Sequence, residues 1–392
     1  MYKILDFLDT WIEGSVPGRP LWNVEQILEG KGPKWNYVDG CMMLAIMKLY
    51  HATGYSKYFD FVKGFIDYFV DADGGILGYL QEELNCDSIN EGKVLFCLYR
   101  ETGLEKYKKA LDNLYGQIKK QPRNQYGSFW HKKIYEGQVW LDGLYMVSPF
   151  YMEYEIEFNN ERNYKDVILQ FENAQKFMRD KETGLFYHAF DASKKMFWAD
   201  KETGLSKNFW LRSIGWYLMA LVDTTEKIDK MLFYEYELLQ GFLRGLIDSI
   251  LKFIDNKEYM FCQIPNLPGE KGNYFETSGS CAIAYSILKA VRLGYIPGYY
   301  YTVGEKIFNS VKQSKLDTTG GNFALKDICL VAGLGGMPGK GPYKLRDGTK
   351  EYYFSEPKVE NDAKGLAPFL FAYSELLMKG NERWTLMDKS VN

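Results

Sequence analysis

Residues 36–58, NYVDGCMMLAIMKLYHATGYSKY, contain a segment that is apolar on nearly every side, then Thr53-Gly54, then the start of a second helical segment. A helix with apolar residues all round is buried in a core, and a glycine after the last helical residue is the usual left-handed cap. The same arrangement returns at Thr102-Gly103, between residues 87–101 and a further amphipathic stretch. The chain therefore repeats a pair of helices, one buried and one amphipathic, and such repeats form an open solenoid or a closed ring.

Six segments along the chain have the composition of buried helices. They are residues 36–52, 87–101, 141–157, 212–223, 277–293 and 362–379. Amphipathic stretches alternate with them at 56–70, 104–119, 162–178, 232–254 and 300–314, and a stretch within 2–30 supplies the sixth. The alternation predicts an all-α protein with a six-fold α/α barrel, in which six parallel inner helices are surrounded by six antiparallel outer helices. An open superhelix of helix pairs is the alternative.

Length and charge limit the domain organisation and the class of partner. The 392 residues exceed an average domain, but no stretch rich in proline and serine interrupts the helical series. We therefore expect a single domain over residues 1–392. The 48 basic and 51 acidic residues give a net charge of −3, which argues against binding to nucleic acid or an anionic membrane. The chain also lacks an apolar run of the ~18 residues that a membrane span requires.

Cysteine and histidine usage indicates the compartment and the chance of a metal site. The six cysteines stand singly among apolar neighbours without a C-x-x-C pair, which favours reduced thiols in a cytoplasmic protein. Asp6 and Asp9 interrupt the apolar stretch that a signal peptide needs. Because the chain has three histidines, we do not expect a histidine-rich metal site.

In a barrel of this kind the inner helices all begin at one mouth, so residues at their starts converge in space. These starts hold Tyr37, Asp39, Asp87, Trp140, Asp142, Trp210, Arg212, Thr277, Ser278 and Asp362. Extended segments beginning at Gly127 and Gly184 add His131, next to Lys132, and His188. Indole faces stack on the C–H face of a sugar ring, and arginine or lysine neutralises a uronate carboxylate. The mouth therefore has the composition of a pocket for a sugar acid.

The mouth aspartates also have a structural interpretation. An aspartate at a helix start is a common N-cap worth about 1 kcal/mol, which applies to Asp39, Asp87, Asp142 and Asp362. Asp142 differs, because apolar neighbours such as Trp140 and Leu144 would raise its pKa. A raised pKa would help Asp142 hold a proton near neutral pH, as a general acid must.

Two histidines and a glycine-rich run also have plain structural explanations. A lone histidine such as His131 is more often a hydrogen-bonded structural residue than a ligand. His51 lies at the end of an inner helix, away from the mouth, and we interpret it as structural. The glycine-rich run 333–341 lacks the Lys-Ser/Thr ending of a phosphate-binding loop, so we expect an ordinary loop there.

Eight stretches, in order along nearly the whole chain, carry a resemblance to a known family. They are Trp35-Asn-Tyr-Val-Asp-Gly40, Phe129-Trp-His-Lys-Lys133, Val139-Trp-Leu-Asp-Gly-Leu-Tyr-Met146, Gly184-Leu-Phe-Tyr-His188, Phe209-Trp-Leu-Arg-Ser-Ile-Gly-Trp216, Glu276-Thr-Ser-Gly-Ser280, Val331-Ala-Gly-Leu-Gly-Gly336 and Asn361-Asp-Ala-Lys-Gly365. Together they resemble the unsaturated rhamnogalacturonyl hydrolases of glycoside hydrolase family 105. The resemblance implies a six-fold α/α barrel that hydrates the C4=C5 double bond of an unsaturated uronic acid.

The resemblance also implies roles for individual residues. It places Asp142 as the general acid/base and Asp87 as the second carboxylate. It assigns substrate binding to Tyr37, His131, Lys132, Trp140, His188, Trp210, Arg212 and Trp216. No metal or cofactor is implied, and the expected partner is a small unsaturated oligosaccharide of pectin degradation, bound by a monomer or weak homo-oligomer. Val139 and Glu136-Gly137 depart from the family pattern and border the second sugar subsite.

Other functions fit the same sequence. Unsaturated glucuronyl hydrolases share the fold and the reaction, and the elimination that forms the double bond erases the C4 stereocentre. Specificity then lies in the neighbouring sugar and its linkage. A sugar epimerase, an inverting glycosidase or a non-catalytic sugar-binding barrel are further alternatives.

Overall fold

The computed structural model describes residues 2–228, 231–319, 323–336 and 345–379. Six inner helices follow one another around a ring: α3 (Tyr37–Thr53), α6 (Lys93–Thr102), α8 (Leu141–Phe158), α10 (Leu211–Lys227), α12 (Thr277–Arg292) and α15 (Ala363–Lys379). Neighbouring members are in contact, α6 and α8 through the rings of Phe96 and Phe150 with centroids 5.2 Å apart, and α15 packs against α3, so the ring is closed. This closure excludes the open superhelix.

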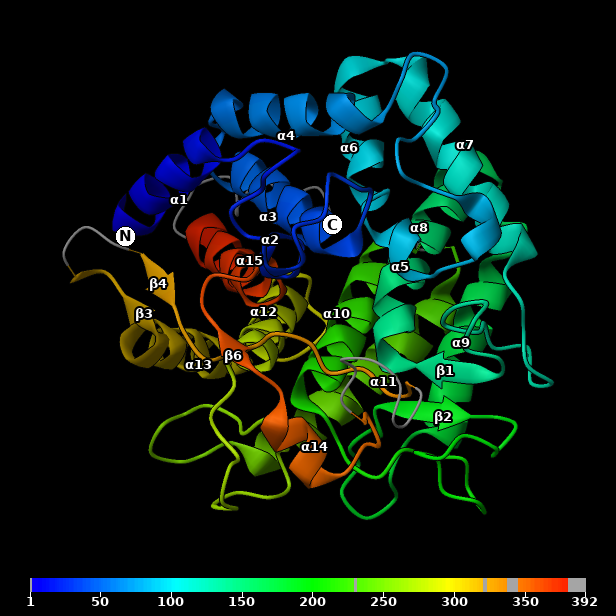
Figure 1. The fold of residues 1–392 in the computed structure, drawn as a ribbon, viewed down its shortest axis with the longest axis vertical. Coiled ribbons are helices and arrows are strands. Elements are labelled where there is room, and N and C mark those ends of the chain that lie inside the picture. The colour runs from blue at the N-terminus through cyan, green and yellow to red at the C-terminus, as the bar shows by residue number, and fades with distance from the viewer. Residues whose placement is uncertain (1, 229–230, 320–322, 337–344, 380–392) are drawn as a thin grey trace.

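Six amphipathic helices surround the ring: α1 (Tyr2–Gly14), α4 (Ser56–Phe69), α7 (Glu105–Lys120), α9 (Tyr164–Phe177), α11 (Phe233–Ile250) and α13 (Tyr300–Lys315). Each of the last five packs against the inner helix that precedes it in the chain, and Figure 1 shows α1, α4, α7 and α13 at the periphery. The predicted all-α, six-fold α/α barrel is confirmed. No helix in the described ranges combines the length and apolar character needed to cross a membrane.

The predicted caps and extended segments are also present. Gly54 and Gly103 end α3 and α6 in the left-handed conformation, with φ of 75° and 66°. Residues beyond each of three outer helices fold back on the helix end through single β-bridges, at Val70–Ile76, Arg123–Phe129 and Arg179–Phe186. The extended segments predicted to begin at Gly127 and Gly184 are the second arms of the last two of these turns.

The second inner helix differs from its prediction as one continuous helix over 87–101. It is divided into α5 (Asp87–Asn90) and α6, and between them the N–H of Gly92 donates to the carbonyl of Ile89, three residues back, over 3.0 Å. This tighter turn lies where α3 approaches closely. A Cβ added to Gly40 of α3 would lie 2.5 Å from the Cα of Glu91.

Short elements cover the side of the barrel where the inner helices begin. They are α2 (Val24–Glu29), α14 (Lys350–Ser355), the 3-10 helix η1 (Gln81–Glu83) and the strand pairs β1 (Gln138–Trp140) with β2 (Ala189–Asp191) and β5 (Ile328–Cys329) with β6 (Lys358–Val359). Elsewhere lie η2 (Leu251–Phe253) and the pair β3 (Leu316–Asp317) with β4 (Ala324–Leu325). The glycine-rich run 333–341 forms no helix over 333–336, and its remainder lies outside the described residues.

Candidate active site

The mouth of the barrel is built from the first turns of the inner helices and from a backbone ladder beside them. Asp87 is the first residue of α5 and Asp142 the second of α8. The backbone N–H of His131 donates to Gln138 over 2.8 Å, and that of Leu141 donates to His188 over 3.1 Å. Strands β1 and β2, paired with Trp140 opposite Ala189, complete the ladder. These bonds position His131, Trp140 and His188 next to the two aspartates.

Asp87 lies in a basic environment. Its carboxylate is 2.6 Å from the Lys132 ammonium and 3.5 Å from His131 Nε2, and its side chain is 14% exposed. Burial alone would raise the pKa of Asp87, but Lys132 and His131 outweigh it and hold that pKa below its ordinary value. Burial lowers the pKa of His131 to about 4, in spite of the neighbouring carboxylate. Near neutral pH, Asp87 is therefore ionised and His131 neutral.

Asp142 has different neighbours. Its Oδ2 lies 3.4 Å from His188 Nε2 without a hydrogen bond, and both atoms are buried with no hydrogen-bond partner among the described residues. On the other side of the ring, His188 Nδ1 is 2.7 Å from the hydroxyl of Tyr353 in α14. With that hydroxyl as donor, the imidazole proton is on Nε2 and faces Asp142. Tyr353 was not predicted from the sequence, because a six-residue helix has too few turns to show a periodic pattern.

An aromatic wall connects the surroundings of the two aspartates. Trp140 stacks on His131, with ring centroids 4.8 Å apart and planes 9° apart, and meets His188 edge-on at 5.5 Å. His188 in turn contacts Trp210 at 4.7 Å, and Tyr135 stacks on Trp140 at 5.1 Å. Tyr135 was not among the site residues predicted from the sequence. Such a wall matches the C–H face of a pyranose ring.

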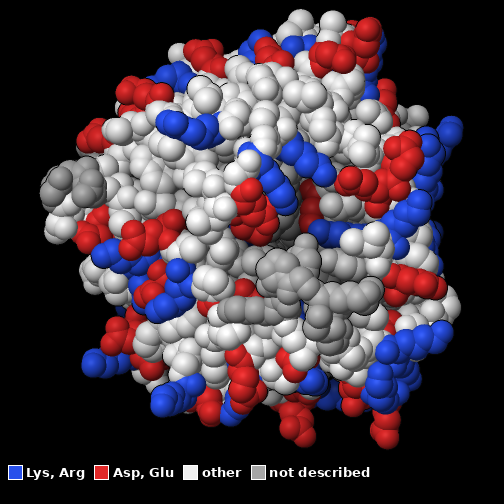
Figure 2. Space-filling view, viewed as in Figure 1, with Lys and Arg blue, Asp and Glu red and all other residues white. Residues whose placement is uncertain are grey.

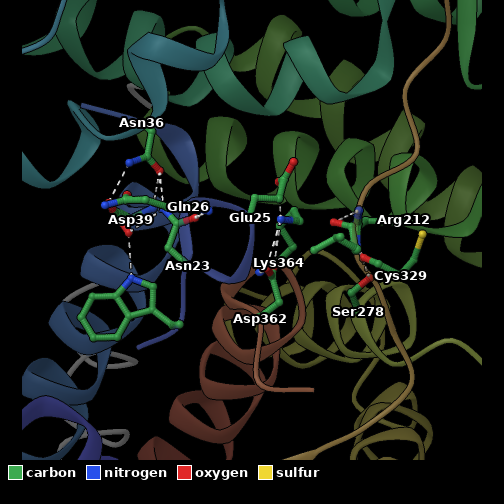
Figure 3. A network of polar contacts seen from close by, with 12 residues as sticks. Asn23, Glu25, Gln26, Asn36, Asp39, Arg212, Ser278, Cys329, Asp362 and Lys364 are labelled. Carbon is green, nitrogen blue, oxygen red and sulfur yellow. Dashed lines mark hydrogen bonds and ion pairs between the residues drawn. The ribbon is translucent and has the colours of Figure 1, made fainter. Parts of the chain in front are cut away.

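Arg212 is a buried cation without an ion-pair partner among the described residues. Its guanidinium donates to the carbonyl oxygens of Cys329 and Leu330, and it lies 3.4 Å from the Ser278 hydroxyl (Figure 3). Its Nε has no hydrogen-bond partner within the described residues, although the side chain is only 2% exposed. Trp210 packs on it, with Cζ 4.7 Å from the ring centroid. The site therefore holds a positive charge beside its aromatic wall that no direct ion pair among the described residues neutralises, although Glu276 and Asp362 act on it at longer range.

A second charged group lies close to Arg212. Lys364 pairs with Glu25 of α2 at 2.7 Å and with Asp362 at 3.0 Å, as Figure 3 shows. Burial would raise the pKa of Glu25, but Lys364 and, at longer range, Arg212 lower it. Burial, followed by the charges of Glu25 and Asp87, raises the pKa of Tyr37 well above its ordinary value. Neither Glu25 nor Lys364 was predicted as a site residue. Glu25 lies in the short α2, far in sequence from the other mouth residues, and Lys364 follows the predicted Asp362 by two residues, within the motif Asn361-Asp-Ala-Lys-Gly365.

Two of the predicted mouth residues have other surroundings. The Asp39 carboxylate accepts hydrogen bonds from the Trp22 indole at 2.9 Å and from Asn36 at 2.7 Å, and burial raises its pKa to about 6. It is not an N-cap, because the Asn36 side chain caps α3. Trp216 stacks on Tyr145 at 4.9 Å in the core, and none of the ring contacts among the described residues links it to the aromatic wall.

The N-cap interpretation holds for Asp362 and not for the two catalytic candidates. The Asp362 carboxylate accepts from the Lys364 backbone N–H at 2.9 Å, at the start of α15. The residues that flank α5 and α8 as caps are Cys86 and Trp140. The side chains of Asp87 and Asp142 are thus not used by helix ends.

These groups can perform acid/base chemistry on a bound sugar acid. Asp87 is ionised, and Asp142 has an oxygen without a hydrogen-bond partner among the described residues. Both lie beside the aromatic wall and the Arg212 guanidinium, which has no direct ion pair within the described ranges. Figure 2 shows a hollow near the centre of this face with acidic and basic side chains around it. Within the described ranges, the residues grouped closely enough to share a metal ion are His51, Cys97 and Glu101, which are not part of this mouth.

Comparisons with known proteins identify the family and the fold. The sequence profile of Glycosyl Hydrolase Family 88 matches residues 22–379. A family 105 glycoside hydrolase from C. acetobutylicum ATCC 824 superposes with a TM-score of 0.83 at 43% identity, over 87% of this chain and 93% of that one. The unsaturated rhamnogalacturonyl hydrolase YesR of Bacillus subtilis (strain 168) is 22% identical over 265 residues, which are 66% of this chain and 72% of that protein. The unsaturated glucuronyl hydrolase from Bacillus sp. GL1 has the same fold, with a TM-score of 0.60 at 12% identity over 87% of this chain and 86% of that one.

Proposed function

The chain belongs to glycosyl hydrolase family 88, and we propose that this glycoside hydrolase removes a 4,5-unsaturated uronic acid from the non-reducing end of oligosaccharides made by polysaccharide lyases. The preferred substrate is the unsaturated disaccharide of rhamnogalacturonan. The observation that carries this proposal is the contrast between two carboxylates at one mouth. Asp87 is held ionised by Lys132 at 2.6 Å, while Asp142 has an oxygen with no hydrogen-bond partner in the described part of the chain.

In the proposed reaction Asp142 donates a proton to C4 of the enol ether. The electron pair of the C4=C5 bond forms the new C–H bond and leaves an oxocarbenium centre at C5. Water adds at C5 and returns a proton to Asp142, so the carboxyl group is regenerated. The resulting hemiketal opens to a ketone and releases the neighbouring sugar. The spacing rules that separate retaining from inverting glycosidases do not apply, because the anomeric carbon is not attacked.

The remaining groups bind the uronate and stabilise the cation. Ionised Asp87 places a negative charge at the mouth, where it favours the oxocarbenium centre over the uncharged enol ether from which that centre forms. Arg212 supplies the positive charge for the uronate carboxylate, because no ion pair among the described residues consumes that charge. Trp140 provides the stacking face, and His188 faces Asp142 with Nε2 3.4 Å from the carboxylate oxygen.

One assay tests both the reaction and the substrate. The ultraviolet absorbance of the C4=C5 bond is followed while the enzyme is mixed with unsaturated rhamnogalacturonan and glycosaminoglycan disaccharides in parallel. We expect faster loss of absorbance with the rhamnogalacturonan disaccharide. A faster reaction of the glycosaminoglycan disaccharide would assign the protein as an unsaturated glucuronyl hydrolase, the function named for the Bacillus sp. GL1 structure of the same fold. Unchanged absorbance with both would leave a sugar-binding barrel.

The first prediction concerns Asp142→Asn. We expect this variant to lose at least about 100-fold in kcat, since proton transfer by a positioned side chain contributes typically 10²–10⁴-fold. Disaccharide binding, measured by calorimetry, should stay close to the wild-type value. The matched control is Asp73→Asn, whose side chain is 98% exposed. If the Asp142 variant kept a tenth of wild-type kcat, another group would be the acid.

A further inference from the structure

A second cavity lies inside the barrel at the end opposite Asp87 and Asp142. Its volume is about 360 Å³, at the small end of the ~300–1,000 Å³ typical of ligand sites. All six inner helices contribute to it, with side chains such as Lys48, Arg100, Glu153, Lys289 and Met378. We refer to it as the axial cavity. The proposed reaction uses none of these residues.

The axial cavity is lined by six basic and three acidic side chains: Lys48, Lys93, Arg100, Lys227, Lys289 and Arg292 against Glu153, Asp223 and Glu226. Part of this positive excess is matched by the partial negative charge at the ends of the inner helices. Specific ion pairs match another part. Lys289 is 2.7 Å from Asp223 and 2.6 Å from Glu226.

Three other basic residues at this end are paired in the same way. Arg292 pairs with Glu375 at 2.6 Å. Lys227 and Arg100 share Glu153, at 2.8 Å and 2.9 Å. These pairs leave two lysines to be accounted for.

Lys48 and Lys93 have no carboxylate partner among the described residues. Lys93 donates to the neutral oxygen of Asn90 at 2.7 Å and to the Tyr145 carbonyl. The ammonium of Lys48 lies over the rings of Tyr285 and Phe371, with centroids 5.4 Å and 5.9 Å away. Burial, reinforced by Lys289, lowers the pKa of Lys48 to about 8, although Asp223, Glu226 and Glu375 act in the opposite direction. A cation at this place lacks the counter-charge that buried lysines require.

We propose that the axial cavity binds a small organic anion, a carboxylate or a phosphate ester, with its charged group on the Lys48 ammonium. The apolar side chains of Met47, Val94 and Phe371 offer contact surface for its carbon skeleton. Access is from the rim, where His51 is exposed and the Arg100 side chain is 47% exposed. The proposal is independent of the hydrolase reaction, because binding at this end can be measured without turnover.

A metal ion is a poorer occupant of this end. His51 Nε2 and Cys97 Sγ are 3.5 Å apart and, with Glu101, could share an ion. Burial and then the charges of Lys48, Arg100 and Lys227 lower the pKa of His51 to about 4. The same positive potential that depresses this pKa opposes a divalent cation and favours an anion.

The test measures binding of inorganic phosphate and of pyruvate by calorimetry and by the shift in Tm, against sodium chloride at equal ionic strength. We expect at least one anion to raise the Tm of the wild type, and Lys48→Met to weaken its binding at least ten-fold. Lys48→Arg, which keeps the charge, should retain binding, and so should Lys181→Met, an exposed lysine used as the control. Binding of phosphate without pyruvate would identify a phosphate site, and binding of pyruvate without phosphate would identify a carboxylate site.

Several results would overturn the proposal. The first is that neither anion binds the wild type, and the second is that Lys48→Met binds the anion as tightly as the wild type does. The third is that binding disappears in Lys132→Met, which would place the anion at the mouth. If Lys48→Met does not fold, a crystal structure of the wild type with the bound anion decides. An anion on Lys48 Nζ supports the proposal, and an anion elsewhere contradicts it.

Discussion

Two aspartates at one mouth differ because of the residues that touch them. Asp87 faces a lysine at 2.6 Å, whereas Asp142 faces an imidazole nitrogen at 3.4 Å. Two carboxylates whose neighbours differ in this way can take different roles, one as the acid and the other as the base. The sequence motifs placed both residues at the mouth, but the ion pair with Lys132 depends on a loop more than forty residues further along the chain and is a property of the folded state.

Lys132→Met should therefore move the acidic limb of the pH–rate profile. The folded-state pKa of Asp87 is held below its ordinary value by Lys132, so the ionised form persists to low pH. Activity that needs ionised Asp87 is lost as the pH falls through this pKa, and removal of the lysine raises the pKa. We expect the acidic limb of kcat/KM to shift to higher pH. Lys109→Met, which removes a lysine near Asp73 outside the mouth, should leave the limb in place; an unshifted limb in the Lys132 variant would contradict the role of the pair.

Tyr353 is expected to act through His188 as a positioning residue. Tyr353→Phe removes the partner of His188 Nδ1 and frees the imidazole to change tautomer. We expect kcat to fall about five- to ten-fold, the equivalent of a hydrogen bond of about 1 kcal/mol, with little change in KM. Tyr352→Phe is the matched control, since its hydroxyl donates to the Gly333 carbonyl at 2.7 Å and not to His188. Equal kcat losses in both variants would reduce Tyr353 to a structural role.

At the scale of elements, helix pairing decides which glycines can be replaced. Gly40 in α3 faces the turn between α5 and α6, where an added Cβ would lie 2.5 Å from the backbone of Glu91. Gly64 in α4 is also helical, but an added Cβ there meets no atom within 4 Å. Periodicity identifies both as helical positions and cannot distinguish them, because the close approach to Gly40 comes from the turn at Glu91, some fifty residues further along the chain.

Alanine at these two positions should have opposite effects on stability. Gly40→Ala forces backbones apart and should lower the free energy of unfolding by about 1–3 kcal/mol, as overpacking does. Gly64→Ala should raise it by up to about 1 kcal/mol, because alanine favours an exposed helix interior over glycine. Urea unfolding of both variants measures the difference. Equal effects would show that the α3 contact with the turn is looser than described.

Sequence patterns predict the long elements better than the short ones. The six buried segments and their amphipathic partners carry enough turns for the 3.6-residue period to be recognised. The elements α2 and α14 have six residues each, and their site residues Glu25 and Tyr353 reach the mouth only through tertiary packing. Trp216 shows the reverse case, since a motif that resembles the family's pocket has its tryptophan stacked on Tyr145 in the core.

At the scale of the whole molecule, closure of the ring joins the first inner helix to the last. The contact between α3 and α15 means that neither end of the helical series has an unpaired inner helix. We therefore predict that residues 1–392 unfold as one domain, as expected from the uninterrupted series. The tryptophans give a way to test this, because residues 217–383 contain none. Eight of the nine tryptophans lie between residues 11 and 216, in the part of the chain that begins the ring.

Phe369→Ala in α15 is the substitution that tests one-domain unfolding. Phe369 is fully buried and stacks on Phe308 of α13 at 4.8 Å, so its loss should cost about 3–5 kcal/mol. If the ring unfolds as a unit, the Tm of this variant falls equally in far-ultraviolet circular dichroism and in tryptophan fluorescence. This holds although residue 369 lies far along the chain from most of the tryptophans. A fluorescence transition that stayed at the wild-type temperature would divide the chain into two domains. The control is Phe233→Ala, at a side chain that is 66% exposed at the start of α11. By either probe, its free energy of unfolding should stay within about 0.5 kcal/mol of the wild-type value.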